Sequence, residues 1–352
     1  MSKKLAWTLF QYVLAFGLLA VVIWLNWNPG KDDGLSYVWH NRILTGDLNF
    51  VYLLLALVIL TLSLAITLVR WYILVRTVGF DFTLRDAFRL GIIGFFFNAF
   101  LPGSVGGDLI KAAALAREKS DRRTRAVATV IMDRVIALWA LIWFVAISGC
   151  IFWSVGGLTE TAQLIVKIAA GIVGVTLTIW LAMGLLSDEQ SERFAQWLSK
   201  APKVGTSLGE LWRAGWTYRR RQKSVALVML ISWVGHIGFV SAFYFGALVF
   251  TNDPASIPKY HEHFLLVPIG LVIQALPLFP GGAGIGELGF GTLYTWFGAL
   301  LRYGVLGSLV MRILTWVIGF GGYFVYLSAR SQFVDDEQEA EQTSGTEKAI
   351  AV

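Results

Sequence analysis

The chain has 352 residues, of which 56% are hydrophobic, 14% aromatic and only 15% charged, and its formal net charge is +6. This composition excludes a water-soluble globular protein and indicates a polytopic membrane protein. The basic residues gather in short segments between apolar runs, as in cytoplasmic loops, which argues against nucleic acid as a partner, and the single Cys150 excludes an intrachain disulfide.

A helix needs roughly 20 apolar residues to cross a hydrocarbon core about 30 Å thick. The first apolar run follows Lys3 and Lys4 like a signal peptide, but its length and the lack of a small-residue cleavage site predict a retained span. The fold class is therefore all-α, with six full transmembrane helices predicted near 5–25, 51–71, 128–153, 164–186, 224–250 and 304–327.

Two other apolar regions, 87–118 and 264–300, are each interrupted near the middle by a Pro-Gly cluster. Their halves are too short to cross a bilayer alone, so each region is predicted to be a broken, re-entrant helical hairpin. Arginines in short loops mark the cytoplasmic side and flank the first region at both ends. The second region starts one span after a cytoplasmic segment. The hairpins are therefore expected to enter from opposite faces.

Residues 1–153 and 164–330 then share one plan: span, span, broken hairpin, span. This predicts two inverted repeats in a single membrane domain, residues 1–330, an organisation typical of secondary transporters. Two sequence matches support the repeat. Pro102 and Pro280 are separated by 178 residues, and an arginine follows each proline by 32 residues, Arg134 and Arg312.

Two polar segments are not predicted to be membrane spans. Residues 187–223 combine aromatic and basic side chains, which predicts a cytoplasmic amphipathic segment lying on anionic lipids. Residues 331–352 are acidic and polar without an apolar periodicity, which predicts a disordered tail.

The first Pro-Gly cluster, "LPGSVGGDL", is expected to line a cavity or a protein interior, because irregular backbone at membrane depth needs polar partners. Asp108 is expected at the N-cap of the second half-helix, and Glu287 at the corresponding place in the second hairpin. Both carboxylates are either simple helix caps or part of a site. The free N–H groups and positive dipole of such a helix end suit an anion such as a phosphate head group.

Arg134 and Arg312 have two interpretations as well. They either extend to the nearer membrane interface, or face the hairpin cavity and hold a phosphate, with Asp133 balancing Arg134. Lys111 is interpreted as a contact between the hairpin and the cytoplasm. The "HEH" motif at 261–263 is interpreted as solvated, and neither a metal nor a cofactor is predicted.

The runs "GIIGFFFNAFLPGSVGGDLIKAAALARE", "RAVATVIMDRVIAL", "LFPGGAGIGELGF" and "MRILTW" resemble the membrane region of lysylphosphatidylglycerol synthase/flippase proteins and their stand-alone relatives, over about residues 50–325. The resemblance implies a bacterial inner-membrane protein that moves a lipid between leaflets, with both termini cytoplasmic by the charge pattern. The positions that match the family's motifs are Pro102, Gly103, Gly106, Gly107, Asp108, Asp133, Arg134, Pro280, Gly281, Gly282, Gly284 and Glu287. Ser104 and Arg312 complete the predicted substrate-binding set.

Full-length members of that family carry a soluble aminoacyl-transferase domain after the membrane region, which is not expected here. The stand-alone relatives are linked with hopanoid, isoprenoid-lipid and glycan contexts. The resemblance therefore leaves the lipid class open, between phospholipids and isoprenoid-linked lipids.

Three functions are compatible with these features. The leading one is a non-enzymatic lipid flippase with a polar groove between the hairpins, passive or ion-coupled, since no Gly-rich nucleotide-binding loop is present. The alternatives are a membrane-embedded transferase acting on a lipid-linked sugar or amino acid, with Asp108 or Asp133 as base, and a scaffold that delivers lipid to a separate enzyme. A homodimer is compatible with the sequence.

Overall fold

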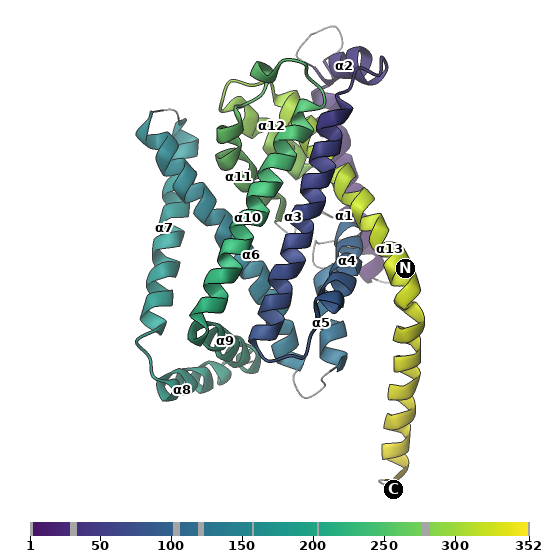
Figure 1. Cartoon of the computed structure of the whole chain (residues 1–352), viewed down its shortest axis with the longest axis vertical. Coiled ribbons are helices and arrows are strands. Elements are labelled where there is room, and N and C mark those ends of the chain that lie inside the picture. Colours follow the sequence, from purple (N-terminus) through teal and green to yellow (C-terminus); the bar gives the residue numbers. More distant parts are fainter. Residues whose placement is uncertain are drawn as a thin grey trace.

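The computed structural model describes residues 3–28, 34–100, 106–118, 123–156, 158–202, 204–275 and 282–350. Within these ranges every regular element is a helix, as the sequence predicts. Figure 1 shows the arrangement. The helices are α1 Lys3–Leu25, α2 Leu35–Val38, α3 Phe50–Thr77, α4 Leu84–Phe100, α5 Gly106–Glu118, α6 Arg123–Ser154, α7 Glu160–Met183, α8 Asp188–Ser199, α9 Gly205–Arg220, α10 Gln222–Leu248, α11 His263–Ala275, α12 Ile285–Thr295 and α13 Leu301–Ile350. Short π- and 3₁₀-helical turns occupy Trp39–Ile43, Pro254–Ser256 and Tyr260–Glu262.

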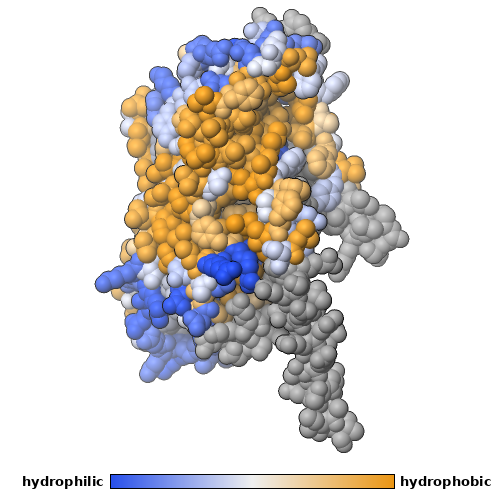
Figure 2. Space-filling view, turned by 45° about the vertical axis from the view of Figure 1, so that its right-hand side comes forward, coloured by the Kyte–Doolittle hydropathy of each residue, from blue (hydrophilic) through white to orange (hydrophobic). Residues whose placement is uncertain are grey.

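Among the described residues, five helices are long and apolar enough to cross a membrane: Phe50–Thr77, Arg125–Ser154, Glu160–Met183, Gln222–Leu248 and Leu301–Ser328. They belong to α3, α6, α7, α10 and α13. The apolar part of α1, Tyr12–Leu25, is shorter, so the sixth span predicted from the sequence stays a prediction. Figure 2 shows the matching surface, a broad apolar belt with hydrophilic residues at both ends of the molecule. Such a belt indicates a membrane protein.

The two interrupted regions form short helices at opposite ends of the bundle. Helices α4 and α5 have 17 and 13 residues, and α11 and α12 have 13 and 11. In Figure 1 α4 and α5 lie in the half of the molecule that ends in α8 and α9, whereas α11 and α12 lie in the half that ends in α2. Each of the four is shorter than the roughly 20 residues that cross a bilayer.

The two halves of the chain interlock. Helices α3 and α10 pack along each other in the centre. Helix α4 packs against α13, and α11 packs against α6, so each pair of short helices rests on the long helix that follows the other pair. The first contact is close because α13 has a glycine there: a Cβ on Gly322 would lie 2.3 Å from the carbonyl oxygen of Ile92.

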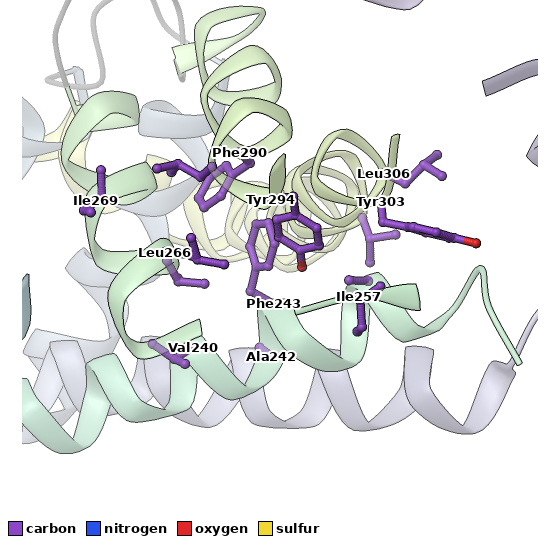
Figure 3. Packing of buried hydrophobic residues seen from close by; sticks show 14 of the residues in the cluster. Val240, Ala242, Phe243, Ile257, Leu266, Ile269, Phe290, Tyr294, Tyr303 and Leu306 are labelled. Atoms are coloured by element: carbon purple, nitrogen blue, oxygen red, sulfur yellow. The ribbon is translucent and has the colours of Figure 1, made fainter. Parts of the chain in front are cut away.

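The second pair of short helices is embedded in an aromatic core. The rings of Phe243 and Phe290 lie 4.3 Å apart, and Tyr294 and Leu266 are packed around them (Figure 3). Burying each such side chain contributes about 1.5–3 kcal/mol. Helices α11 and α12 are therefore held mainly by apolar packing.

The segment predicted to be amphipathic folds as α8 and α9, which pack against each other. The Trp212 indole donates to the Ser191 backbone oxygen at 3.1 Å, and the Arg213 guanidinium pairs with Glu192 at 2.7 Å. The buried Tyr218 hydroxyl donates to the Leu74 carbonyl at 3.2 Å and so ties α9 to the end of α3. The helix assignment of α13 continues to Ile350, and the disorder expected for 331–352 stays a prediction.

Candidate functional site

The first pair of short helices carries a carboxylate–arginine pair. Asp108 lies in the first turn of α5, and its Oδ2 accepts a hydrogen bond from Nε of Arg134 on α6 at 2.5 Å. The expectation that Asp108 occupies the N-cap position is corrected, because α5 already begins at Gly106. Asp108 is buried, whereas the Arg134 side chain keeps 46% of its surface exposed. The carboxylate therefore bridges two helices.

The second pair of short helices repeats this contact. Glu287 lies in the first turn of α12, and its Oε1 accepts from Nε of Arg312 on α13 at 2.7 Å. Its Oε2 also accepts from the Gly284 backbone N–H at 2.7 Å, so Glu287 does cap its helix. Gly284 has a φ of +81° and Gly282 a φ of +66°, values that favour glycine. The Glu287 residue is fully buried.

The two contacts occupy corresponding places. In each, a carboxylate in the first turn of the second short helix meets Nε of an arginine on the long helix that follows. The carboxylate and the arginine are separated by 26 residues in the first pair and by 25 in the second. The sequence predicts all four residues as site residues, but not that they pair in this way.

The expected balance between Asp133 and Arg134 is wrong. The Asp133 Oδ1 accepts from Nε of Arg70 on α3 at 2.8 Å. Arg70 also donates to the Ser232 hydroxyl of α10 at 3.4 Å. Neighbouring side chains on a helix point in different directions, so Asp133 contacts Arg70 whereas Arg134 contacts Asp108. Arg70 lies inside the apolar "ITLVRWYIL" run, and this position is a signal for a buried functional arginine that the sequence interpretation missed.

The environment of Lys111 also differs from the one expected from the sequence. Instead of meeting the cytoplasm, the residue is only 5% exposed. Its ammonium group lies 5.2 Å from the ring centre of Trp71 and 5.4 Å from that of Phe95. The charges that act on it most strongly are those of Asp133, Asp108, Arg134 and Arg70. Lys111 therefore belongs to the same buried group of charges as the first carboxylate–arginine pair.

Glycines allow α4 and α5 to approach closely at this point. A Cβ on Gly107 would lie 1.8 Å from the carbonyl oxygen of Gly94, and a Cβ on Gly94 would lie 2.8 Å from Cε of Lys111. The Gly107 N–H donates to the Asn98 side-chain oxygen at 2.8 Å. Asn98 is a contact that the sequence interpretation missed, and it fixes the start of α5 against the end of α4.

Several predicted positions lie outside the described residues, namely Pro102, Gly103, Ser104, Pro280 and Gly281.

In the "HEH" motif, the ring of His261 stacks on Phe152, and the buried His263 imidazole hydrogen-bonds to the Tyr294 hydroxyl at 2.7 Å. Within the part of the chain that the structure describes, no group of three or more His, Cys, Asp or Glu side chains is arranged to hold a metal ion.

The helices and their apolar belt define a multi-pass α-helical membrane protein with a carboxylate–arginine pair in each set of short helices. The chain belongs to the family described as the lysylphosphatidylglycerol synthase transmembrane region, whose model matches residues 12–321. Two membrane proteins of Methanothermobacter thermautotrophicus, both described as UPF0104 membrane proteins, are similar to it. One is 24% identical over 294 residues, with 77% of this chain and 83% of the relative covered. The other is 24% identical over 324 residues, covering 87% and 89%. No solved structure matches the chain significantly.

Proposed function

We propose that this protein is a flippase that moves a phosphate-bearing lipid head group between the two leaflets of a bacterial inner membrane. The observation that carries the proposal is the duplicated carboxylate–arginine contact, Asp108 with Arg134 and Glu287 with Arg312, one in each pair of short helices. A lipid phosphate needs cationic partners wherever it leaves water, and arginines within the helix bundle can supply them. Membership of a lipid-related membrane family supports the same class of substrate.

The proposal includes a membrane arrangement. Helices α4 and α5 form one re-entrant hairpin and α11 and α12 the other, while α1 provides a sixth span. The 13 residues of α5 extend only about 20 Å, so this helix cannot cross a core of about 30 Å alone. The basic residues of α8 and α9 favour a cytoplasmic location for their end of the bundle, and the charge pattern of the chain favours cytoplasmic termini.

Within this arrangement the two hairpins insert from opposite faces, as parts of two inverted repeats. The interlocked packing of α4 on α13 and α11 on α6 supports the repeat, because the same relation holds in both directions. A polar groove between the hairpins would carry the head group while the acyl chains stay in lipid. Two cation-bearing stations, one beside each pair of short helices, can hold the phosphate in turn.

No covalent step is part of this proposal. An arginine that is paired with a carboxylate can exchange it for a phosphate, because both are oxyanions that accept from the same guanidinium donors. Asp108 and Glu287 are then the groups that are displaced and re-paired during transport. They are also the candidates for coupling to an ion or proton, since intramembrane carboxylates serve that role in transporters.

The cytoplasmic leaflet is the second partner in the proposal. Trp197 on α8 has 63% of its surface exposed, and the neighbouring Phe194 ring stacks on it at 5.4 Å between centroids. Basic side chains on the same pair of helices include Arg193 and Arg220. Exposed aromatic and basic groups together favour the interface of an anionic membrane.

Lipid movement by the purified protein in proteoliposomes tests the function. Fluorescent analogues of phosphatidylglycerol, phosphatidylethanolamine and a polyprenyl phosphate are added to one leaflet, and their arrival in the other is followed by chemical quenching. Arg134→Gln is expected to slow transport of the preferred lipid at least tenfold, about the effect of losing a hydrogen bond to a charged group.

Arg76→Gln is the matched control, because this arginine lies near the end of α3 with its side chain 49% exposed and pairs with the exposed Asp81. The control is expected to transport at the wild-type rate. Equal transport by both variants, with equal thermal stability, would remove Arg134 from the site. Absence of lipid movement by the wild-type protein across the whole panel would contradict the flippase proposal itself.

A further inference from the structure

Ser308 on α13 is a buried serine whose hydroxyl group is not satisfied. The residue is 2% exposed, and among the described residues no group makes a hydrogen bond with its Oγ. A serine in a helix can satisfy its hydroxyl on its own backbone, by donating to a carbonyl oxygen about one turn earlier. Four serines in the long helices do so: Ser63, Ser148, Ser232 and Ser241. A buried hydroxyl that forgoes this bond lowers stability, so its position needs a functional explanation.

The direction in which Ser308 faces follows from its neighbours on α13. A Cβ on Gly291 of α12 would lie 2.9 Å from the Val305 side chain, so Val305 faces α12. Arg312 faces the same helix, since its Nε donates to the Glu287 carboxylate. Ser308 comes three residues after Val305 and four before Arg312, which places it on the same face of α13. It therefore faces α12 between Gly291 and Glu287, beside the first turn of that helix.

The Arg312 guanidinium extends toward the turn that carries Ser308, because side chains on a helix lean toward its N-terminus. Arg312 has further contacts besides Glu287. Its Nη2 atom, however, is buried and meets no acceptor in the part of the chain that the structure describes. One face of α13 thus carries a hydroxyl and a guanidinium nitrogen that can both still donate. A phosphate has several acceptor oxygens and can accept from both groups.

The surroundings also suit a phosphate electrostatically. Helix α12 has 11 residues and begins at Ile285, so the positive end of its dipole lies beside Glu287. Glu287 accepts a second hydrogen bond, from the Gly284 N–H at 2.7 Å, through the oxygen that does not meet Arg312. This bond remains when the guanidinium turns to a phosphate, so the displaced carboxylate keeps a donor.

We propose that Ser308 and Arg312 together bind the lipid phosphate at the second of the two stations, with Ser308 as a ligand of the head group. The position is closed in this structure, so a phosphate enters it as Glu287 separates from the guanidinium. Ser308 then donates its hydroxyl hydrogen to a phosphate oxygen, and no covalent bond forms or breaks. This inference rests on the proposed function, because it completes the station that the Glu287–Arg312 pair provides there.

Binding of soluble phosphate probes to the full chain in detergent, measured by calorimetry, tests the assignment. The probes are dihexanoyl phosphatidylglycerol and inorganic phosphate, and dihexanoyl glycerol is the control that lacks phosphate. All measurements use the Arg134→Gln protein, so that the first station does not contribute. Adding Ser308→Ala is expected to weaken binding of the phosphatidylglycerol probe at least tenfold, because a hydrogen bond to a charged group is lost. This loss corresponds to about 1.4 kcal/mol.

Ser63→Ala in the same protein is the matched control. Ser63 is 1% exposed on α3, and its hydroxyl donates to the Ile59 carbonyl oxygen at 2.7 Å. Removing this satisfied hydroxyl is expected to leave binding of the probe unchanged. The control therefore separates the loss of any buried serine hydroxyl from the loss of the one at the second station.

Thermal unfolding separates a ligand from a structural serine. Removing a buried hydroxyl that has no partner is expected to leave the unfolding temperature of Ser308→Ala unchanged or higher. Loss of a structural contact would lower it. A lowered unfolding temperature therefore overturns the assignment.

The binding outcomes are distinct. Binding of the phosphatidylglycerol probe alone supports the assignment with a lipid head group as ligand, and binding of both phosphate probes supports it with the phosphate group as sufficient. Equal affinity with and without Ser308→Ala overturns it. So does equal binding of dihexanoyl glycerol, or binding of neither phosphate probe to the Arg134→Gln protein.

Failure of this inference can be told from failure of the flippase proposal. Lipid movement by the wild-type protein together with unchanged affinity in Ser308→Ala refutes the role of Ser308 and leaves the flippase proposal intact. Binding that depends on Ser308, without lipid movement by the wild-type protein, keeps the phosphate position and contradicts the flippase.

Discussion

Replacing Arg312 by glutamine leaves the Glu287 carboxylate without its cation, and the structure indicates how large the loss of stability should be. The Glu287 residue has no exposed surface, and the Arg312 side chain has only 5%. Removing one partner of a buried ion pair typically costs about 3–5 kcal/mol, because the remaining charge is buried and uncompensated. For a chain of this size, each kcal/mol lowers the unfolding temperature by about 2 °C. Arg312→Gln is therefore expected to unfold about 6–10 °C below the wild type.

Arg134→Gln removes the equivalent hydrogen bond but should cost much less. Almost half of the Arg134 side chain is exposed, and the Asp108 carboxylate that remains still has the Lys111 ammonium group nearby, so the loss is about 1 kcal/mol. The expected decrease in unfolding temperature is about 2 °C. The assay is thermal unfolding in one detergent at one scan rate, followed by intrinsic tryptophan fluorescence.

A double variant separates the effect of the two buried charges on the unfolding temperature from the effect of side-chain packing. Glu287→Gln combined with Arg312→Met removes both charges and keeps a side-chain acceptor for the Gly284 N–H. It is expected to recover more than half of the temperature lost in Arg312→Gln, because two buried charges are removed together. Equal destabilisation by Arg134→Gln and Arg312→Gln, or no recovery in the double variant, would refute the reasoning.

Two further predictions concern packing. Gly107→Ala is expected to abolish transport and lower the unfolding temperature, because the new Cβ would lie 1.8 Å from the Gly94 carbonyl oxygen. Gly171→Ala is the control, since a Cβ at Gly171 meets open space, and this variant should behave like the wild type in both assays. Tyr218→Phe removes the hydrogen bond to the Leu74 carbonyl and should lower the unfolding temperature by about 2 °C, corresponding to about 1 kcal/mol; a variant as stable as the wild type would show that this bond contributes little.

The long helices could be predicted from the sequence because their apolar runs have no competing interpretation. The run near 164–186 became α7, Glu160–Met183, and the run near 224–250 became α10, Gln222–Leu248. The short helices could be predicted for an equally local reason, because the sequence has a Pro-Gly cluster in the middle of each apolar region and such residues interrupt helices. These features depend on neighbours in the chain.

The pairing of the charges could be predicted only in part. The adjacent residues Asp133 and Arg134 seemed natural partners, but a helix turns about 100° per residue and sends them to different neighbours. Which distant side chain each one meets depends on how α3, α5 and α6 are rotated about their axes. The same holds for Lys111, whose burial depends on the approach of α4 at Gly94. No local pattern encodes these rotations.

The interlocked packing of α4 on α13 and α11 on α6 has a consequence for biosynthesis. Helices α4 and α5 are synthesised before α13. Until α13 has been made, α4 lacks its close contact with Gly322. The two halves of the chain therefore cannot mature one after the other as separate modules. The final packing of α4 therefore waits until α13, the last helix, has been made.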